Sequence, residues 1–369
     1  MTRGTRVLLV GKGYPDRGGI PTFVQLLLDG DLADDYELSF LNVAHHGVPE
    51  GGALTTGNVT RTLRDAWAVF TRAKAQDIVH IHSALAPSVT MLRAGLLALA
   101  ARLRGCAVIV HAHGGNIETT LQSRRGRRAL TLSMLPAHRV VAVWSAGARA
   151  LEEVLGDTKV RLIDNGVEVS RYLDPEPPHD PPRVLYVGLL TPRKGVLDLI
   201  EASRTLAAQG VQHELCLLGG TPDEGPDAAA PVLEAADGTA RLLGTRPPED
   251  MPQAYAEADV FCLPSWWEAM PLSVLEAMAA GLPVVATDVG DVSRIVTAEC
   301  GTVVPVRSPQ PLAEALRPLL EDVATRRRMG DAARERARSQ FSGSTTANAI
   351  GAVYDELRPE GRAARTRLG

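Results

Sequence analysis

The chain lacks any apolar run long enough to cross a bilayer, although 45% of its 369 residues are hydrophobic. A membrane-spanning helix needs about 20 consecutive apolar residues, so this sequence does not predict one. No secretory segment is visible either, because Met1–Arg6 leads directly into a short apolar stretch, and we expect a cytoplasmic protein. A chain of this length exceeds one ordinary core, which predicts two globular domains.

The chain is also poor in cysteine, and its cysteines form no motif. Cys106, Cys216, Cys262 and Cys300 are scattered singly, with no Cys-x-x-Cys spacing among them. Three of them lie within or beside apolar, strand-like runs. We therefore expect small buried hydrophobic side chains rather than disulfides or metal ligands.

A proline-rich segment marks a domain boundary. Residues 173–182 hold five prolines and no hydrophobic period, and an apolar strand follows them. Charge divides at the same place: residues 1–172 carry 20 basic and 15 acidic residues, and residues 173–369 carry 19 and 28. We predict an N-terminal domain (1–172), a linker (173–182), a C-terminal domain (183–343) and a terminal helix with a basic tail (344–369).

Both domains alternate strand and helix patterns. Strands are expected at 5–11, 36–42, 78–82, 106–112, 139–144, 160–163, 183–188, 213–218, 240–243, 259–263, 282–286 and 302–304. Helices are expected at 19–29, 60–75, 87–104, 120–134, 146–155, 194–208, 249–257, 271–280, 310–322, 324–339 and 344–357. This alternation predicts two doubly wound parallel sheets, which bind ligands at the carboxyl ends of their strands.

The loop and helix that follow residue 263 carry the strongest functional signal. Proline is favoured at the first helical position, so Pro271 predicts a helix that begins there and ends at Gly281. The free N–H groups of Leu272, Ser273 and Val274 would point beyond the sheet edge, where a helix N-terminus suits a phosphate.

Two carboxylates accompany this helix. Glu268 precedes its N-terminus, after which come Met270 and Pro271, and Glu276 lies within the helix. The two glutamates cannot form a close pair. One can face a diphosphate-linked group while the other accepts hydrogen bonds from a pair of hydroxyls. The alternative is an ordinary amphipathic helix with solvated glutamates.

The loop after the first strand is rich in glycine. Gly11 and Gly13 begin a dinucleotide fingerprint, but Asp16 occupies its third glycine position, so that signal is weak. Gly18 and Gly19, directly before a helix, are the better signal. Without a Cβ they let a backbone N–H approach a phosphate or sugar, unless they form only a flexible turn.

Two histidine pairs end neighbouring strands. His80 and His82 share one strand face, and so do His111 and His113, because side chains repeat every two residues. Zinc is one alternative, but no carboxylate follows at ligand spacing, and we expect no metal. The other alternative is a set of hydrogen-bonding groups that face a sugar or an acceptor.

The second domain opens on a strand that ends at Gly188. Arg193 and Lys194 follow it at the start of a helix. A diphosphate leaving group needs positive charge as its bond to the sugar breaks, and without a metal that charge comes from Arg, Lys and helix N-termini. The alternative is a solvated pair at a helix start.

The spacing from Glu268 to Glu276, followed by the sequence AMAAGLPVVA, resembles the signature of the family 4 retaining glycosyltransferases (glycosyl transferases group 1). This resemblance implies the GT-B fold, two Rossmann-like domains that face a cleft, with a terminal helix that crosses back to the first domain. It also implies that Glu268 lies beside the donor sugar and that Glu276 takes the ribose hydroxyls of a nucleotide-sugar.

The same resemblance extends to weaker positions. It implies that His113 touches the transferred sugar, that the Gly18-Gly19 pair approaches the donor, and that Arg246 lies where the family holds the base. One departure is Leu189, which stands where the family has an arginine; Arg193 would take over that role. For the acceptor side it suggests four further residues: His82, His111, Gly114 and Gly115.

A basic segment predicts a further contact. Arg124, Arg125, Arg127 and Arg128 lie on an expected helix that also carries Leu121, Leu130, Leu132, Met134 and Leu135. Such a face can rest on an anionic membrane, at its inner surface, and reach a lipid-linked acceptor. A solvated basic helix is the alternative.

We therefore expect a metal-independent, retaining glycosyltransferase without a cofactor, whose co-substrate is a nucleotide-sugar. Its acceptor would be a sugar, a lipid-linked glycan or a small molecule, in the synthesis of cell-surface polysaccharide or glycolipid. A nucleotide-sugar 2-epimerase of the same fold is a rival. An NAD-dependent oxidoreductase and a non-catalytic nucleotide-sugar-binding protein are rivals from other classes. No nucleic-acid partner is expected.

Overall fold

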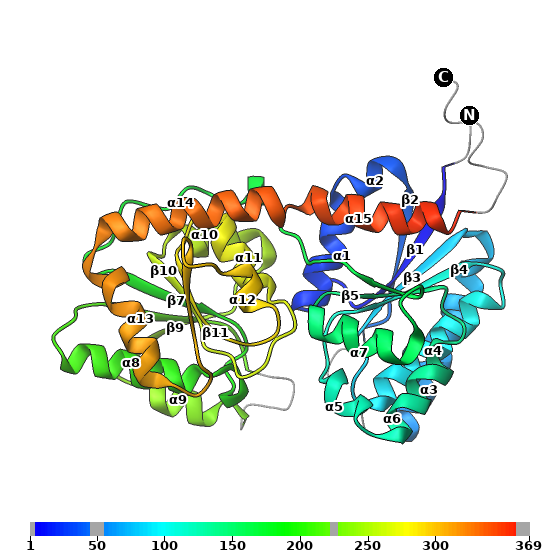
Figure 1. Ribbon diagram of the computed structural model, residues 1–369, viewed down its shortest axis with the longest axis horizontal. Helices are drawn as coiled ribbons and strands as arrows, with labels where there is room; N and C mark the ends of the chain where they lie inside the picture. Colours follow the sequence, from blue (N-terminus) through cyan, green and yellow to red (C-terminus); the bar gives the residue numbers. More distant parts are fainter. Residues whose placement is uncertain (1–3, 45–54, 222–227, 359–369) are drawn as a thin grey trace. The chain divides into compact units, whose positions relative to one another are not determined.

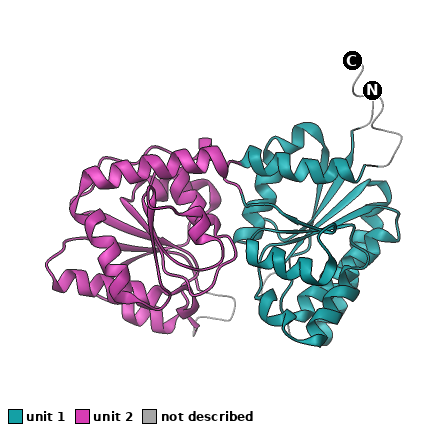
Figure 2. Cartoon of the chain, viewed as in Figure 1, with its two compact units in different colours: residues 1–47, 51–165, 343–369 teal, residues 48–50, 166–342 magenta. Residues whose placement is uncertain are grey.

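The structure is a computed structural model that describes residues 4–44, 55–221 and 228–358. Its chain divides into two compact units, coloured separately in Figure 2. The N-terminal unit holds the described residues up to Asn165 together with those from Gly343 onward, and the C-terminal unit holds residues 166–342 apart from the gap.

The chain thus passes between the units at residues 165–166 and 342–343, not at the proline-rich segment. That segment is fixed to the C-terminal unit by hydrogen bonds. The backbone N–H of Glu176 donates to the carbonyl of Ala256 at 3.0 Å, and the His179 ring bonds to Asp259 at 3.0 Å.

The N-terminal unit is built on a six-stranded parallel sheet in the order β2-β1-β3-β4-β5-β6. Its strands are β1 (Arg6–Gly11), β2 (Glu37–Asn42), β3 (Ile78–Ser83), β4 (Ala107–Ala112), β5 (Arg139–Ala142) and β6 (Val160–Leu162). Figure 1 labels the strands β1 to β5. The central strands β3 and β4 are buried almost throughout, as strands covered on both faces are, although His80, His82 and Ser83 interrupt the apolar residues of β3 and His111 those of β4.

Helices connect and cover these strands. They are α1 (Gly19–Asp29), α2 (Leu32–Asp35), α3 (Thr56–Arg72), α4 (Ser88–Arg102), α5 (Ile117–Leu121), α6 (Arg124–Met134), α7 (Ser145–Leu155) and α15 (Gly343–Glu356). The short α2 was not predicted, because four residues carry no readable helical period.

The single helix predicted over 120–134 is in fact two, α5 and α6. Ser123 caps the second helix by accepting a hydrogen bond from the Gly126 N–H at 2.9 Å. The break also changes which apolar side chains are exposed. Leu121, Leu130 and Met134 are buried, so the apolar face predicted for this segment was wrong in those three positions, and only Leu132 and Leu135 are exposed.

The terminal helix α15 belongs to the N-terminal unit, where its aromatic residue Tyr354 is fully buried. The Tyr36 hydroxyl donates to the Asp355 carboxylate at 2.8 Å, and the Thr346 hydroxyl donates to the Asp164 carbonyl at 3.0 Å. The predicted basic tail, from residue 359 onward, lies outside the described residues.

The C-terminal unit has a second six-stranded parallel sheet, in the order β12-β11-β10-β7-β8-β9. Its strands are β7 (Arg183–Val187), β8 (Glu214–Leu218), β9 (Ala240–Gly244), β10 (Val260–Leu263), β11 (Val284–Thr287) and β12 (Gly301–Val304). All twelve predicted strands are therefore present, and the predicted doubly wound architecture is confirmed in both units.

The helices of this unit are α8 (Val196–Ala208), α9 (Ala230–Ala236), α10 (Met251–Ala256), α11 (Leu272–Ala279), α12 (Val292–Ile295), α13 (Pro309–Glu321) and α14 (Val323–Gln340). Helices α9 and α12 were not predicted. Both are short, and a proline within its first turn obscures the helical pattern of α9.

All four cysteines are buried free thiols, as predicted, and burial raises the pKa of the Cys262 thiol well above its usual range. Among the described residues, no helix combines the length and apolarity that a bilayer-spanning segment needs.

A glycine allows α14 to pack closely on the end of α11. A Cβ added to Gly330 would lie 2.1 Å from the carbonyl oxygen of Gly281, which follows α11. Glycine to alanine usually stabilises an exposed helix by about 1 kcal/mol, but overpacking costs about 1–3 kcal/mol.

We therefore expect Gly330→Ala to lower the unfolding temperature of the protein, measured by calorimetry or circular dichroism. Asp331→Ala is the matched control, because this exposed neighbour on the same helix should change stability by less than about 0.5 kcal/mol. A stabilised Gly330→Ala protein would contradict the close packing.

Candidate functional site

The C-terminal unit has a topological switch point between β7 and β10, which are adjacent in the sheet although β8 and β9 separate them in sequence. Ligands of doubly wound sheets bind at such a point, where the loops after the two strands meet. A backbone hydrogen bond joins these two loops: the main-chain N–H of Trp266 donates to the Arg193 carbonyl at 3.0 Å. Gly195 has a φ of 66°, and a Cβ there would lie 1.8 Å from the Pro264 carbonyl oxygen.

An ion pair lies at this junction. Lys194 Nζ, after β7, is 2.6 Å from Glu268 Oε1, after β10, and both side chains are largely buried. The Ser265 hydroxyl donates to the same carboxylate oxygen at 2.7 Å. The structure thus brings together two residues that were predicted from separate motifs. It adds Ser265, which the sequence analysis did not select.

The loop that carries Glu268 is fixed from several sides. The Trp266 indole N–H donates to Asp198 at 2.6 Å, and the Arg307 guanidinium lies 4.3 Å from the centre of the Trp266 ring. The Thr287 hydroxyl donates to the carbonyl of Ser265. A polar group held in this way is preorganised, because little freedom remains to be lost on binding.

Glu276 lies one turn into α11 and is held by two tyrosines. The Tyr255 hydroxyl donates to its carboxylate at 2.7 Å, and Tyr172 also hydrogen-bonds to it. Burial raises the pKa of Glu276, and the two tyrosine hydrogen bonds oppose that shift. The sequence offered no signal for these tyrosines, since they come from α10 and from the segment before β7.

The helix start differs by one residue from the prediction. Pro271 is the N-cap of α11, with a ψ of 120°, and the helix begins at Leu272, so Pro271 is not the first helical residue. Met270 and Pro271 are buried, whereas Leu272 and Ser273 are partly exposed. The N–H groups expected at the helix start are therefore those of the first helical turn, as predicted.

The other predicted residues of this unit lie in environments that differ from that of the Lys194–Glu268 ion pair. Arg193 is exposed beside Lys194, and Gly188 lies so close to Gly219 that a Cβ on the latter would meet the Gly188 carbonyl at 1.7 Å. Arg246 does not contact the Lys194–Glu268 ion pair but forms one of its own. Its guanidinium is 3.1 Å from Glu257, at the end of α10. A role for Arg246 in donor binding stays a prediction.

In the N-terminal unit, Gly18 and Gly19 form the start of α1. Gly18 is the N-cap, with a φ of 121° that disfavours any residue with a side chain, and it is exposed. The loop after β4 is packed more tightly. A Cβ on Gly115 would lie 2.8 Å from the Ala86 backbone nitrogen, and the Leu85 N–H donates to the Gly114 carbonyl at 3.2 Å.

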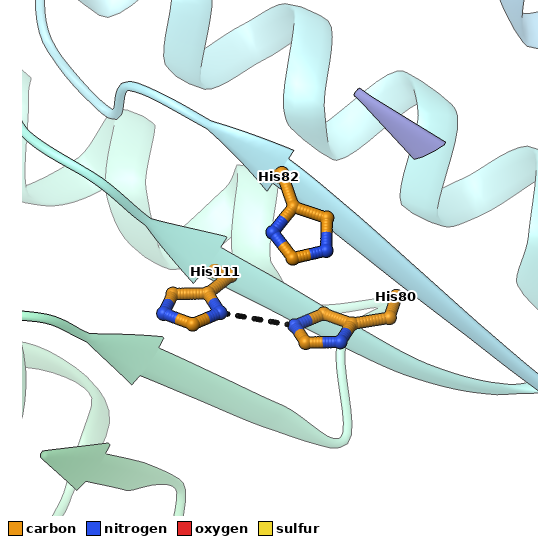
Figure 3. A group of neighbouring side chains, drawn as sticks. All are labelled: His80, His82 and His111. Carbon is orange, nitrogen blue, oxygen red and sulfur yellow. Dashed lines mark hydrogen bonds between the residues drawn. The ribbon is translucent and has the colours of Figure 1, made fainter. Parts of the chain in front are cut away.

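The four histidines gather on one side of β3 and β4. Figure 3 shows three of them, with a hydrogen bond between His80 and His111. His80 Nε2 is 3.2 Å from His111 Nδ1, and His80 Nδ1 is 2.7 Å from the Tyr354 hydroxyl. His82 Nδ1 is 2.9 Å from His113 Nε2. Phe23 of α1 packs its ring against His82, His111 and His113.

Ring nitrogens of His80, His82 and His111 lie within 4.8 Å of one another, as metal ligands would. Their orientation fits mutual hydrogen bonding better. The rings of His80 and His111 are parallel within 4°, and two facing nitrogens are at hydrogen-bond distance. Rings that ligate one metal ion direct their lone pairs at the ion, whereas here a nitrogen of His80 faces a nitrogen of His111 across a hydrogen bond.

Burial keeps these histidines neutral. It lowers the pKa of His80 and of His113 to about 3, and it lowers the pKa of His82 and His111 well below the usual value. In the unfolded chain the same residues would titrate near a pKa of about 6.5. The unfolded state therefore binds more protons below neutral pH.

We expect the free energy of unfolding to fall as pH is lowered through about 6.5, because folded, neutral histidines resist protonation. Each fully buried histidine contributes up to about 1.4 kcal/mol per pH unit. Unfolding temperatures from pH 8 to pH 5 would measure this dependence. The slope should be shallower in His80→Asn, which removes one such group, and an equal slope in both proteins would contradict the prediction.

Comparisons with known proteins agree with this architecture. Residues 4–171 match the sequence family described as Glycosyltransferase Family 4, and residues 174–336 match Glycosyl transferases group 1. A D-inositol 3-phosphate glycosyltransferase of Corynebacterium efficiens is 36% identical over 180 residues, 47% of this chain and 42% of that protein. A phosphatidyl-myo-inositol mannosyltransferase of Mycolicibacterium smegmatis is 32% identical over 263 residues, 67% of this chain and 62% of that protein. The aligned part therefore spans less than two thirds of each relative.

Solved structures share the fold at low sequence identity. The sucrose-phosphate synthase of Thermosynechococcus elongatus aligns over 96% of this chain and 99% of its own, with a TM-score of 0.75 and 23% identity. Anabaena Alr3699/HepE, solved in complex with UDP and glucose, aligns over 95% and 100%, with a TM-score of 0.74 and 19% identity. With its two parallel sheets and its two family matches, the chain belongs to the family 4 glycosyltransferases (glycosyl transferases group 1), which have the GT-B fold.

Proposed function

We propose that the protein is a retaining glycosyltransferase that moves a sugar from a nucleotide-diphosphate sugar to a glycan, lipid-linked or small-molecule acceptor. The observation that carries this proposal is the junction of Lys194, Glu268 and the α11 N-terminus at the switch point of the C-terminal sheet. Positive charge and a carboxylate meet there, and the N–H groups at the start of α11 follow Glu268 by four residues in the chain.

These groups suit the bond that breaks in the transfer. As the glycosidic bond of the donor breaks, negative charge develops on the diphosphate. Lys194, the exposed Arg193 and the N–H groups at the start of α11 supply the positive potential that stabilises this charge. The reaction would then need neither a metal ion nor a cofactor.

Glu276 is the residue we assign to the ribose. Its carboxylate already accepts hydrogen bonds from Tyr255 and Tyr172, and a carboxylate has about four acceptor sites, so it can accept further bonds from the ribose hydroxyls. Glu268, whose oxygen is held by Lys194 and Ser265, would contact the sugar, as would His113.

The names of two relatives refer to D-inositol 3-phosphate, a small molecule, and to phosphatidyl-myo-inositol, a lipid, which supports both of these acceptor classes in the proposal. We propose a place in the synthesis of cell-surface polysaccharide or glycolipid, in the cytoplasm. Among the predicted acceptor residues, His82 and His111 are buried, and Gly114 and Gly115 shape the loop beside His113.

A thermal-shift screen of the full chain against UDP-, GDP-, ADP- and dTDP-sugars tests the donor. A ligand at 100 times its Kd stabilises the folded state by about 2.7 kcal/mol. We expect one nucleotide-sugar class to raise the unfolding temperature, with or without EDTA. A response to NAD(H) alone, or a loss of the effect with EDTA, would contradict the proposal.

The nucleotide-sugar that raises the unfolding temperature in this screen, the responding donor, is then used to assay sugar transfer by the Lys194→Ala variant. We expect transfer to fall by about 100-fold or more, the usual loss when one group that stabilises transition-state charge is removed. The unfolding temperature should fall as well, because Glu268 loses its partner in a largely buried ion pair, but this loss should be small beside the loss of activity. Arg338→Ala, which breaks an exposed ion pair with Glu335 in the same unit, is the control and should keep full activity. Equal losses of stability and activity in Lys194→Ala would contradict its assignment.

We also propose that the N-terminal unit contacts an anionic membrane. Helix α4 has no charged residues apart from Arg93 and Arg102. Even so, three leucines on this helix and one directly after it are exposed, at spacings of three and four residues. These are Leu92, Leu96, Leu99 and Leu103. An apolar surface of this kind on a helix is normally covered.

The exposed apolar surface extends over the two helices that pack beside α4. Val59, Leu63 and Trp67 are exposed on α3, and Leu132 and Leu135 on or just after α6. Residues 55–135 also carry eleven lysines and arginines against three acidic residues, and the predicted arginines of α6 are exposed. Exposed leucines with a basic surround suit an anionic lipid surface.

We expect the protein to bind vesicles of phosphatidylglycerol and phosphatidylcholine at low salt, and to bind pure phosphatidylcholine several-fold less. Leu99→Glu with Leu103→Glu should weaken binding several-fold in a flotation assay. The control Leu242→Glu changes an exposed leucine of the C-terminal unit and should bind normally. Binding that is unaffected by the paired substitution would contradict this surface.

A further inference from the structure

The hydrogen bonds of the buried histidines form two separate groups. One runs from Tyr354 through His80 to His111, and the other joins His82 to His113. His113 therefore has one hydrogen-bonded neighbour among these rings, and that neighbour occupies its Nε2. Its Nδ1 is left for other contacts, and the residue as a whole is only half-buried.

The position of the proton in the His82–His113 hydrogen bond follows from the surroundings of the other ring nitrogen of His82, Nε2. Its Nε2 is buried and has no hydrogen-bond partner among the described residues. If the proton were on Nε2, a buried N–H would be left without an acceptor, which folded proteins rarely tolerate. If the proton is on Nδ1, only a ring lone pair is unpartnered, and Nδ1–H donates to His113.

This assignment determines the state of His113. A nitrogen that accepts a hydrogen bond carries no proton, so Nε2 of His113 is bare. Because the ring is neutral, its single proton must then be on Nδ1. His113 would meet a ligand with an N–H donor instead of a lone pair.

We propose that His82 is a positioning residue that holds His113 in its Nδ1–H tautomer, so that His113 donates a hydrogen bond to an oxygen of the bound sugar or acceptor. The tautomer follows from the histidine contacts alone, and only the role toward a sugar rests on the proposed function. His113 would then act as a neutral donor and not as a general base.

Nuclear magnetic resonance of the full protein labelled with ¹⁵N-histidine tests the tautomer without any substrate. Two-bond ¹H–¹⁵N correlations at pH 7 distinguish a protonated ring nitrogen from a bare one, and the signals of His113 are those lost in His113→Gln. We expect Nδ1 to be protonated and Nε2 bare. A protonated Nε2 would overturn the proposal, and so would stoichiometric zinc in the purified protein with these rings as its ligands.

Variants of His82 test the positioning. The side-chain amide of Asn can take the place of the Nδ1–H donor, so His82→Asn should keep the His113 tautomer, whereas His82→Phe should shift its signals toward the other form. Tyr354→Phe is the matched control, because it removes a hydrogen bond from the other group of rings. It should leave the signals of His113 unchanged. A His82→Phe protein with an unchanged His113 would overturn the proposal.

Kinetics with the responding donor separate this role from a purely structural one. Loss of one hydrogen bond in the transition state corresponds to a fall of about tenfold in kcat. We expect that fall in His82→Phe with KM for the donor nearly unchanged, and recovery in His82→Asn. Equal kcat in the two variants would overturn the positioning role. If no nucleotide-sugar binds, the proposed function fails, and the resonance measurement still decides the tautomer.

Discussion

The candidate site depends on the parallel alignment of strands in the C-terminal sheet. Parallel strands bring all their carboxyl ends to one edge, and the strand order puts β7 beside β10 at that edge. Lys194 and Glu268, 74 residues apart in the chain, are therefore neighbours at 2.6 Å. Without this order the lysine and the carboxylate would be unrelated surface charges, and α11 would not begin beside them.

Burial governs the chemistry of both units, with opposite results. In the C-terminal unit, burial raises the pKa of Glu276, but two tyrosine hydroxyls stabilise its charged form. In the N-terminal unit, burial keeps the histidines neutral, and His82 and His113 are joined by a hydrogen bond between their ring nitrogens. Partners within the fold, not exposure to water, therefore decide what each group offers to a ligand.

Much of the fold could be predicted from periodicity and from glycine and proline. Every strand was found, because buried strands such as β7, β10 and β11 are short runs of mostly apolar residues, and the more exposed edge strands β2 and β9 still contain leucines. The failures were local. Short helices such as α9 carry too little period to be read, and the single helix predicted over 120–134 is divided at Ser123 by a cap. The burial of Leu130 and Met134 depends on packing against neighbouring elements, which the local sequence pattern does not reveal.

The sequence by itself determined the two-domain architecture, the motif around Glu268 and Glu276, and the histidine pairs, because each depends on residues close together in the chain. Only the tertiary structure decided which of these residues meet. It joined Lys194 to Glu268, supplied Ser265, Tyr172 and Tyr255 as partners, and paired Arg246 with Glu257. Side-chain hydrogen bonds between distant segments are set by strand order and helix packing, so local sequence cannot specify them.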